Sequence, residues 1–418
     1  MRCQLCLVAS LASGCSFTKN PATSGGGDDD ANPIDGLRVD VVEFDAPAEC
    51  SMWQPHNFVA CSIPAPSGGL DLTAGTWTFS TDSGSLIDPT GIVTTPANKP
   101  ITQTDSSIAY LISIASLNVE AGATLQVIGA EPLIVASWDT IMVSGTIDVG
   151  STATRAGAGS SPQPECAITP WSTTAGLTAM LGQDEVPSTG GSGGGGGGAL
   201  NGNGGGGGSG DSPEASDGGF GGVGTSAPAL VRGGCSGANS GKAGPGDMGN
   251  PNAISVGGSG GGAVELAAKT SAVITGEVLA GGAGGGGSPA GSASGGGGGG
   301  AGGLLAFDAP TIFFTGATIA ANGGGGGASG GFAETGNGGQ DGQPSATQAA
   351  VGGAPVSACA EAGQLGGAGS IPNGATSTNH VFACGGSGGG GGVGFVLTWG
   401  LVTKSAATIS PVDMPGPS

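Results

Sequence analysis

The sequence predicts an all-β fold: a parallel β-helix, or β-solenoid, with glycine-rich inserts packed as polyglycine II. Three observations predict it: short segments of alternating apolar residues, a strand unit that recurs, and uninterrupted glycine runs beside that unit. Glycine makes up 95 of the 418 residues. Because each glycine inside a helix costs about 1 kcal/mol relative to alanine, the composition disfavours a helical bundle. The glycines do not recur at every third position throughout, which excludes collagen.

The strand pattern begins near residue 107. Ile108, Tyr110, Ile112 and Ile114 alternate with the residues between them, and a period of two continues as far as Val149. Glycines and a proline separate the successive segments. We predict the first solenoid coils at 107–150, preceded at 37–106 by an N-terminal, disulfide-containing β region or cap.

The internal repeat supports the solenoid. The unit at 133–147 aligns without gaps to 264–278, and it aligns again to 304–319 with one extra residue before the last strand. This alignment matches Leu304 with Val264, and a poorer fourth copy covers 395–409. A unit of three short strands cannot bury its apolar face alone, so stacked copies would form one inner column. A sandwich of antiparallel hairpins is the alternative.

Glycine dominates the later part of the chain. We predict a glycine-rich insert at 151–256, repeated strand units with glycine runs at 257–395, and a terminal strand or cap with a tail at 396–418. Glycine can adopt an extended helix of three residues per turn whose amides point to neighbouring chains, a packing that any Cβ would obstruct. The alternative is a disordered tail over 190–395, since isolated glycine-rich chains behave as coils. The glycine runs occupy 193–198, 204–208, 284–287, 295–300, 323–327 and 388–392.

The N-terminus indicates export. Residues 1–14 contain Arg2, an apolar stretch and small residues that lead directly into Cys15, as in a bacterial lipoprotein signal peptide. We predict cleavage before Cys15 and a lipid on its sulfur, with an ordinary secretory signal as the alternative. Residues 15–36 are small and acidic, and we predict that they form a flexible tether. The predicted location is the outer membrane or cell surface, or the exterior if no lipid is attached.

Six further cysteines favour disulfides, because their number is even and the chain is predicted to be exported. Proximity in the sequence favours three pairs, although the spacing alone leaves the connectivity open. No Cys-x2-Cys spacing supports a zinc site, and we predict neither a metal nor a cofactor. The three favoured pairs are Cys50–Cys61, Cys166–Cys235 and Cys359–Cys384.

Charged residues limit the chemistry that is open to the chain. The net charge is −21 with only nine Lys and Arg residues, which excludes a basic face for nucleic acid. A β-helix hydrolase or lyase would need paired carboxylates, or a carboxylate with a cation. Glu265 and Glu277 flank inward apolar residues, so we expect both to face solvent. Neither His56 nor His380 lies near a nucleophile turn. We therefore predict no catalytic residues; the carboxylates considered are Asp139, Asp148, Glu265, Glu277 and Asp308.

Several segments resemble a known group of proteins. The chain is similar to uncharacterised glycine-rich exported lipoproteins of myxobacterial type, and the resemblance covers nearly all of the mature chain. It implies export and a repeat architecture, and it carries no activity. The segments that resemble the group are Gly14-Cys15-Ser16-Phe17, Ser144-Gly145-Thr146-Ile147-Asp148-Val149, Arg232-Gly233-Gly234-Cys235, Asp308-Ala309-Pro310-Thr311-Ile312 and Ala321-Asn322-Gly323-Gly324-Gly325.

These observations predict a non-enzymatic structural or adhesive lipoprotein of the cell surface. Its expected partners are the membrane, through the lipid anchor, and an extracellular polysaccharide or other surface proteins. The alternative is a β-helix protein that binds polysaccharide or cleaves it as a lyase or hydrolase. Tryptophan faces can stack on sugars, although they more often pack in a core; the five are Trp53, Trp77, Trp138, Trp171 and Trp399.

Overall fold

The computed structural model describes residues 50–417 outside nine short gaps, and these residues belong to one unit, Phe44–Ser418. The predicted signal peptide at 1–14, the lipidation site Cys15 and the tether at 15–36 lie outside the described residues. Within the described part, no helix has the length and apolar character needed to span a membrane. The gaps are 161–165, 175–177, 185–190, 211–215, 245–251, 332–334, 357–359, 378–379 and 382–383.

The described residues form two large sheets and one small one, together with two 3-10 helices, η1 (Cys50–Met52) and η2 (Ala60–Ser62). The first sheet has the order β1 (Leu70–Leu72), β7 (Leu117–Val119), β10 (Thr140–Val143), β14 (Ser271–Ile274), β16 (Leu304–Thr315), β13 (Ala263–Ala268), β9 (Leu133–Ser137), β6 (Ile108–Ile114), β5 (Ala97–Thr102), with β19 (Phe395–Ser405) beside β16 and β21 (Met414–Pro415) beside β19. The second has the order β20 (Thr408–Ser410), β17 (Thr318–Ala320), β15 (Glu277–Leu279), β11 (Thr146–Asp148), β8 (Ala123–Ile128), β2 (Gly75–Ser80), β3 (Ser85–Ile87), β4 (Val93–Thr94). The third pairs β12 (Ser209–Gly210) with β18 (His380–Val381).

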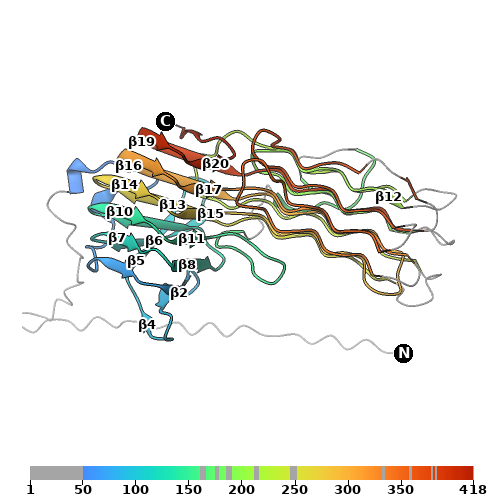
Figure 1. Ribbon diagram of the computed structural model, residues 1–418, viewed down its shortest axis with the longest axis horizontal. Coiled ribbons are helices and arrows are strands. Elements are labelled where there is room, and N and C mark those ends of the chain that lie inside the picture. The colour runs from blue at the N-terminus through green and yellow to red at the C-terminus, as the bar shows by residue number, and fades with distance from the viewer. Residues whose placement is uncertain are drawn as a thin grey trace, which may run out of the picture. The chain divides into compact units, whose positions relative to one another are not determined.

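The all-β class is correct, but the predicted parallel β-helix is wrong. The two large sheets are mixed and form a curled half-barrel: β5 pairs antiparallel with β6, and β3 pairs antiparallel with β2 and β4. The repeat units do pair in parallel, but the chain leaves the sheets after each unit and runs out as glycine-rich segments (Figure 1). Glycine has no side chain to contribute to an inner column, so these segments do not close a coil.

Two apolar cores lie on opposite faces of the first sheet. The inner core fills the space between the two large sheets, where Phe79, Phe307 and Phe314 are at most 1% exposed. The outer core lies on the other face of the first sheet and includes Trp53 and Phe58, which come from the segment that precedes β1. Residues 50–63 therefore cover a face that the sequence pattern alone would leave to solvent.

The register of the third repeat differs from the predicted alignment by one residue. Val264 pairs with Leu305, whereas the gapless alignment matched it with Leu304. Leu305 lies in the inner core and Leu304 in the outer core. Because successive side chains of a strand point to opposite faces, the shift exchanges the two faces of the first half of β16. It places Asp308 opposite Ala267, on the outer face.

The glycine runs pack by backbone hydrogen bonds that repeat every three residues. In the run 193–198, successive amides donate in turn to three neighbours: residues 180–183, the run 204–208 and the run 295–300. This is the pattern of polyglycine II helices packed side by side. The bundle formed by the six runs and the segments that pack against them is called here the glycine bundle. Its six bonds from 193–198, each 2.8–3.0 Å long, are Gly193→Gln183, Gly194→Gly208, Gly195→Gly296, Gly196→Met180, Gly197→Gly205 and Gly198→Gly299.

Close approach explains why the interior of the glycine bundle is glycine. A Cβ placed on Gly298 would lie 2.1 Å from the carbonyl oxygen of Gly196, where no side chain fits. None of the six runs contains a glycine with positive φ, so lack of space and not backbone handedness requires the residue type. Figure 1 shows these undulating segments side by side beyond the ends of the sheets. The described residues of 190–395 thus make regular backbone contacts.

Two of the three favoured disulfides are present. Cys50–Cys61 joins η1 to η2 above the outer core, and Cys166–Cys235 joins two segments at the glycine bundle. Cys384 is also disulfide-bonded, while Cys359 lies outside the described residues.

Candidate functional site

Two of the five carboxylates considered from the sequence come together. Glu265 on β13 and Asp308 on β16 lie on neighbouring strands and share the outer face of the first sheet, because Glu265 pairs with Ala306 and Ala267 with Asp308. Glu265 is completely buried and Asp308 is 8% exposed. The expectation that Glu265 faces solvent is therefore wrong. The side chain does point away from the inner core, but the segment 50–63 covers that face.

The segment 50–63 also supplies the partners of this carboxyl pair. The Asn57 side-chain amide donates to Glu265 Oε2 at 2.9 Å. The His56 backbone N–H donates to Asp308 Oδ2 at 2.8 Å, and His56 Nδ1 lies 3.2 Å from the same oxygen. Trp399 stacks on the His56 ring with 4.9 Å between the ring centroids. The contacts fasten the segment to the sheet.

The electrostatics of the pair favour a bound proton. Burial, reinforced by the nearby Asp308 carboxylate, raises the pKa of Glu265 to about 8. Burial also raises the pKa of Asp308, although its hydrogen bonds from His56 act in the opposite direction. Among the described residues, Glu265 Oε1 has no hydrogen-bond partner. Since Glu265 is fully buried, the pair is closed to a substrate in this conformation.

The other three carboxylates are separated from this pair. Asp148 forms an ion pair with Arg155 at 2.6 Å. The Thr270 hydroxyl donates a hydrogen bond to Asp139 Oδ1 at 2.9 Å, and Glu277 is partly exposed on β15. In the described parts of the chain, no group of three His, Cys, Asp or Glu side chains is arranged to hold a metal ion. The side chain of His380 lies outside the described residues.

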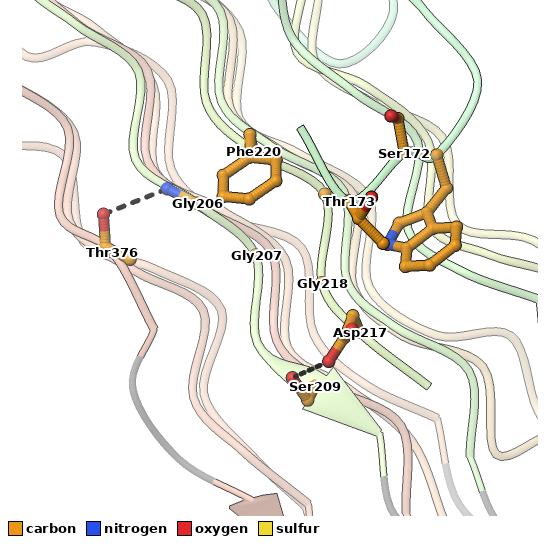
Figure 2. A pocket seen from close by; sticks show the side chains of 11 residues that line it. Ser172, Thr173, Gly206, Gly207, Ser209, Asp217, Gly218, Phe220 and Thr376 are labelled. Atoms are coloured by element: carbon orange, nitrogen blue, oxygen red, sulfur yellow. Dashed lines mark hydrogen bonds between the residues drawn. The ribbon is translucent and has the colours of Figure 1, made fainter. Parts of the chain in front are cut away.

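A pocket on the edge of the glycine bundle is the more accessible candidate site. Its cavity measures about 340 Å³, and Trp171 and Phe220 supply its aromatic lining. Figure 2 shows Phe220 and Asp217 on one segment, with Ser172 and Thr173 on another. The remaining lining residues are Gly206, Gly207, Ser209, Gly218, Gly219 and Thr376. We call this cavity the bundle pocket.

The period of three places the side chains of the bundle pocket. Asp217, Phe220 and Val223 are exposed, whereas the residues that precede them, at 216, 219 and 222, are buried. In a helix with three residues per turn, every third residue lies on the same side. The segment therefore lies at the bundle edge and points one row of side chains outward. Phe220 in that row is 40% exposed.

Two hydrogen bonds hold the polar rim of the bundle pocket (Figure 2). The Gly206 N–H donates to Thr376 Oγ1 at 3.0 Å, and the Ser209 hydroxyl lies 3.5 Å from Asp217 Oδ1. Among the described side chains, no Lys, Arg or His lines the cavity. The described lining therefore combines aromatic surface, hydroxyl groups and one carboxylate.

Trp171 was among the residues that the sequence indicated, whereas Phe220 was not. The signal for Phe220 is present in Asp217-Gly-Gly-Phe220-Gly-Gly-Val223, where two glycines separate each side chain from the next. The other four tryptophans pack against the cores of the sheets. Trp53, Trp138 and Trp399 pack in the outer core, and Trp77 Nε1 donates to the Thr73 carbonyl at 2.9 Å.

No family model matches the chain, and no curated protein or solved structure matches it.

Proposed function

We propose that this protein is a non-enzymatic structural or adhesive element of the cell surface, exported and lipid-anchored through Cys15. The observation that carries the proposal is the glycine bundle, in which successive amides of 193–198 bond to three different neighbours. The interior of such a bundle has no space for the side chains that catalysis requires. It does provide a stiff block that extends from the sheets.

The carboxyl pair supports the same proposal. Of the five carboxylates considered from the sequence, Glu265 and Asp308 are the two that the fold brings together, and residues 50–63 cover them. A charge of −21 keeps the chain soluble and repels acidic surfaces, as suits an element that stands away from a cell.

Amide hydrogen exchange on the purified mature chain tests the structural part of the proposal. Amides in the runs 193–198 and 295–300 should exchange as slowly as those in β13 and β16, because both sets donate to buried carbonyl groups. Exchange at the rate of an unstructured chain would contradict it. Turnover of a polysaccharide by the same preparation would contradict the non-enzymatic assignment.

Labelling with radioactive palmitate in a bacterial host tests the anchor. The unchanged chain should incorporate label and fractionate with membranes, whereas Cys15→Ala should do neither. If the wild-type chain carried no label and appeared in the medium, the protein would be secreted and not lipid-anchored. The structural part of the proposal would not be affected.

A further inference from the structure

We propose that the bundle pocket binds a neutral saccharide. The inference deepens the adhesive part of the proposed function, on which it rests for access to an extracellular polysaccharide. It depends on the presence of both Trp171 and Phe220 in the lining of one cavity of about 340 Å³ at the edge of the glycine bundle.

Phe220 is not needed for the packing of the bundle. Its position belongs to the outward row, and the ring is 40% exposed, whereas packing in this region is carried by backbone contacts such as Gly207 N–H to Gly219 O at 2.9 Å. Two aromatic side chains that line one cavity provide apolar surface that a ligand can cover. The apolar face of a sugar ring, formed by its C–H groups, fits such a surface.

The polar groups of the bundle pocket suit hydroxyl groups. Asp217 can accept hydrogen bonds from ligand hydroxyls, and Ser172 and Thr173 can donate or accept. Thr376 Oγ1 accepts from Gly206 N–H, so its own hydroxyl hydrogen is directed elsewhere. Among the described residues, none accepts a hydrogen bond from the Trp171 indole N–H.

Charge selects neutral ligands over acidic ones. The described part of the lining contains one carboxylate, Asp217, and no cationic side chain. An anionic sugar would bring its charge near Asp217 on a chain whose net charge is −21. The volume lies at the lower end of the range for small-molecule sites, about 300–1,000 Å³, which suits a short stretch of a neutral polysaccharide.

The glycine floor gives the pocket its depth. A Cβ on Gly206 would lie 3.6 Å from the Gly219 carbonyl oxygen and 3.2 Å from the Thr376 methyl group, a tight contact that a small shift of the exposed Thr376 side chain would relieve. Gly206→Leu should therefore fill the bundle pocket while the bundle stays intact. Gly338→Leu is the matched control, because its Cβ also has space, with the nearest atom at 3.4 Å, and it does not line the pocket.

Isothermal titration calorimetry with the purified mature chain tests the inference. The probes are cellotetraose, chitotetraose and maltotetraose as neutral oligosaccharides, and tetragalacturonate as an acidic one. We expect saturable binding of at least one neutral probe and none of the acidic probe. Phe220→Ala and Trp171→Ala should each weaken binding about tenfold or more, since each removes one aromatic face. Val223→Ala, on the same outward row, should leave binding unchanged.

Absence of binding by all three neutral probes would overturn the inference. Binding that survives both Phe220→Ala and Gly206→Leu, or binding of the acidic probe alone, would overturn it as well. Hydrogen exchange of the run 295–300, measured on each variant, shows separately whether the bundle is intact. A protected bundle that binds no sugar leaves the structural proposal standing, and an unprotected one contradicts that proposal whatever the calorimetry shows.

Discussion

The sheets and the glycine bundle exclude water in two different ways. In the sheets, side chains such as Phe307 and Phe314 fill the space between layers, and the backbone of each strand forms hydrogen bonds with the neighbouring strands of the same sheet. In the glycine bundle the segments approach so closely that the backbone itself fills the space. Each segment bonds to several neighbours around it, as the amides of 193–198 show.

The two regions are therefore destabilised by opposite kinds of substitution. The inner core loses stability when a side chain becomes smaller, because a cavity is left. The interior of the bundle loses stability when any side chain is added, because Cβ atoms would meet carbonyl oxygens at distances near 2 Å. Four predictions test this contrast.

The largest effect is expected for Gly298→Val in the interior of the bundle. The added Cβ would lie 2.1 Å from Gly196 O, and the segments would have to separate to admit it. We expect a loss of more than about 4 kcal/mol in the free energy of unfolding, or failure to fold. Urea denaturation followed by circular dichroism measures it. Gly338→Val at the exposed edge is the control, and an equal loss there would refute the close-packing explanation.

Phe307→Ala should be the most damaging simple truncation in the inner core. The Phe307 side chain is fully buried and meets Phe314 edge to face with 5.0 Å between the ring centroids. We expect a loss of about 3–5 kcal/mol in the free energy of unfolding. Phe313→Ala removes the same ring from the same strand, where it is 38% exposed, and should cost much less. Equal losses would mean that the inner core is not where stability resides.

Glu265→Gln should stabilise the fold at alkaline pH. The pKa of Glu265 rises from 4.5 to about 8 on folding, so its contribution to stability is complete below pH 4.5 and is lost as the pH rises through 8. Glutamine keeps an acceptor for Asn57 and removes this loss. The variant should therefore exceed the wild type by a few kcal/mol at pH 9 and match it near pH 4.

Urea denaturation at several pH values between 4 and 9 measures the difference between Glu265→Gln and the wild type. Glu277→Gln, on the partly exposed surface of β15, is the matched control. A stability difference for Glu265→Gln that did not change with pH would show that the buried carboxyl is not the cause.

The smallest difference is expected between the two disulfides. Cys166–Cys235 closes a loop with a sequence separation of 69, and Cys50–Cys61 one of 11. Loop entropy alone predicts that removing the longer one destabilises the fold by about 1–2 kcal/mol more. Two double variants, each with both cysteines of one disulfide changed to serine, measure the difference in stability when they are compared by thermal unfolding. A larger loss on removal of Cys50–Cys61 would indicate that the attachment of residues 50–63 over the outer core matters more than chain entropy.

Much of the fold could be predicted from residue types and their spacing. The period of two marked the strands from Ile108 to Val149, and the repeat marked the strand units that pair in parallel. The glycine runs indicated lateral packing by backbone bonds, since no other residue type permits it. The exposure of Phe220 also has a signal in the sequence, the period of three formed by Asp217, Phe220 and Val223.

The site and the topology depended on contacts between distant segments. No local pattern shows that residues 50–63 cover the outer face of the first sheet, so Glu265 was expected in solvent although it is buried. A one-residue change of register in β16 decided that Asp308 would join it.

The sequence by itself determined which segments are strands and which can pack without side chains, because those properties depend on neighbours within a few residues. Tertiary structure alone decided that the units form a curled half-barrel and that Trp171 and Phe220 line one cavity. The physical reason is that these outcomes depend on which distant surfaces exclude water together, and a linear pattern does not specify that choice.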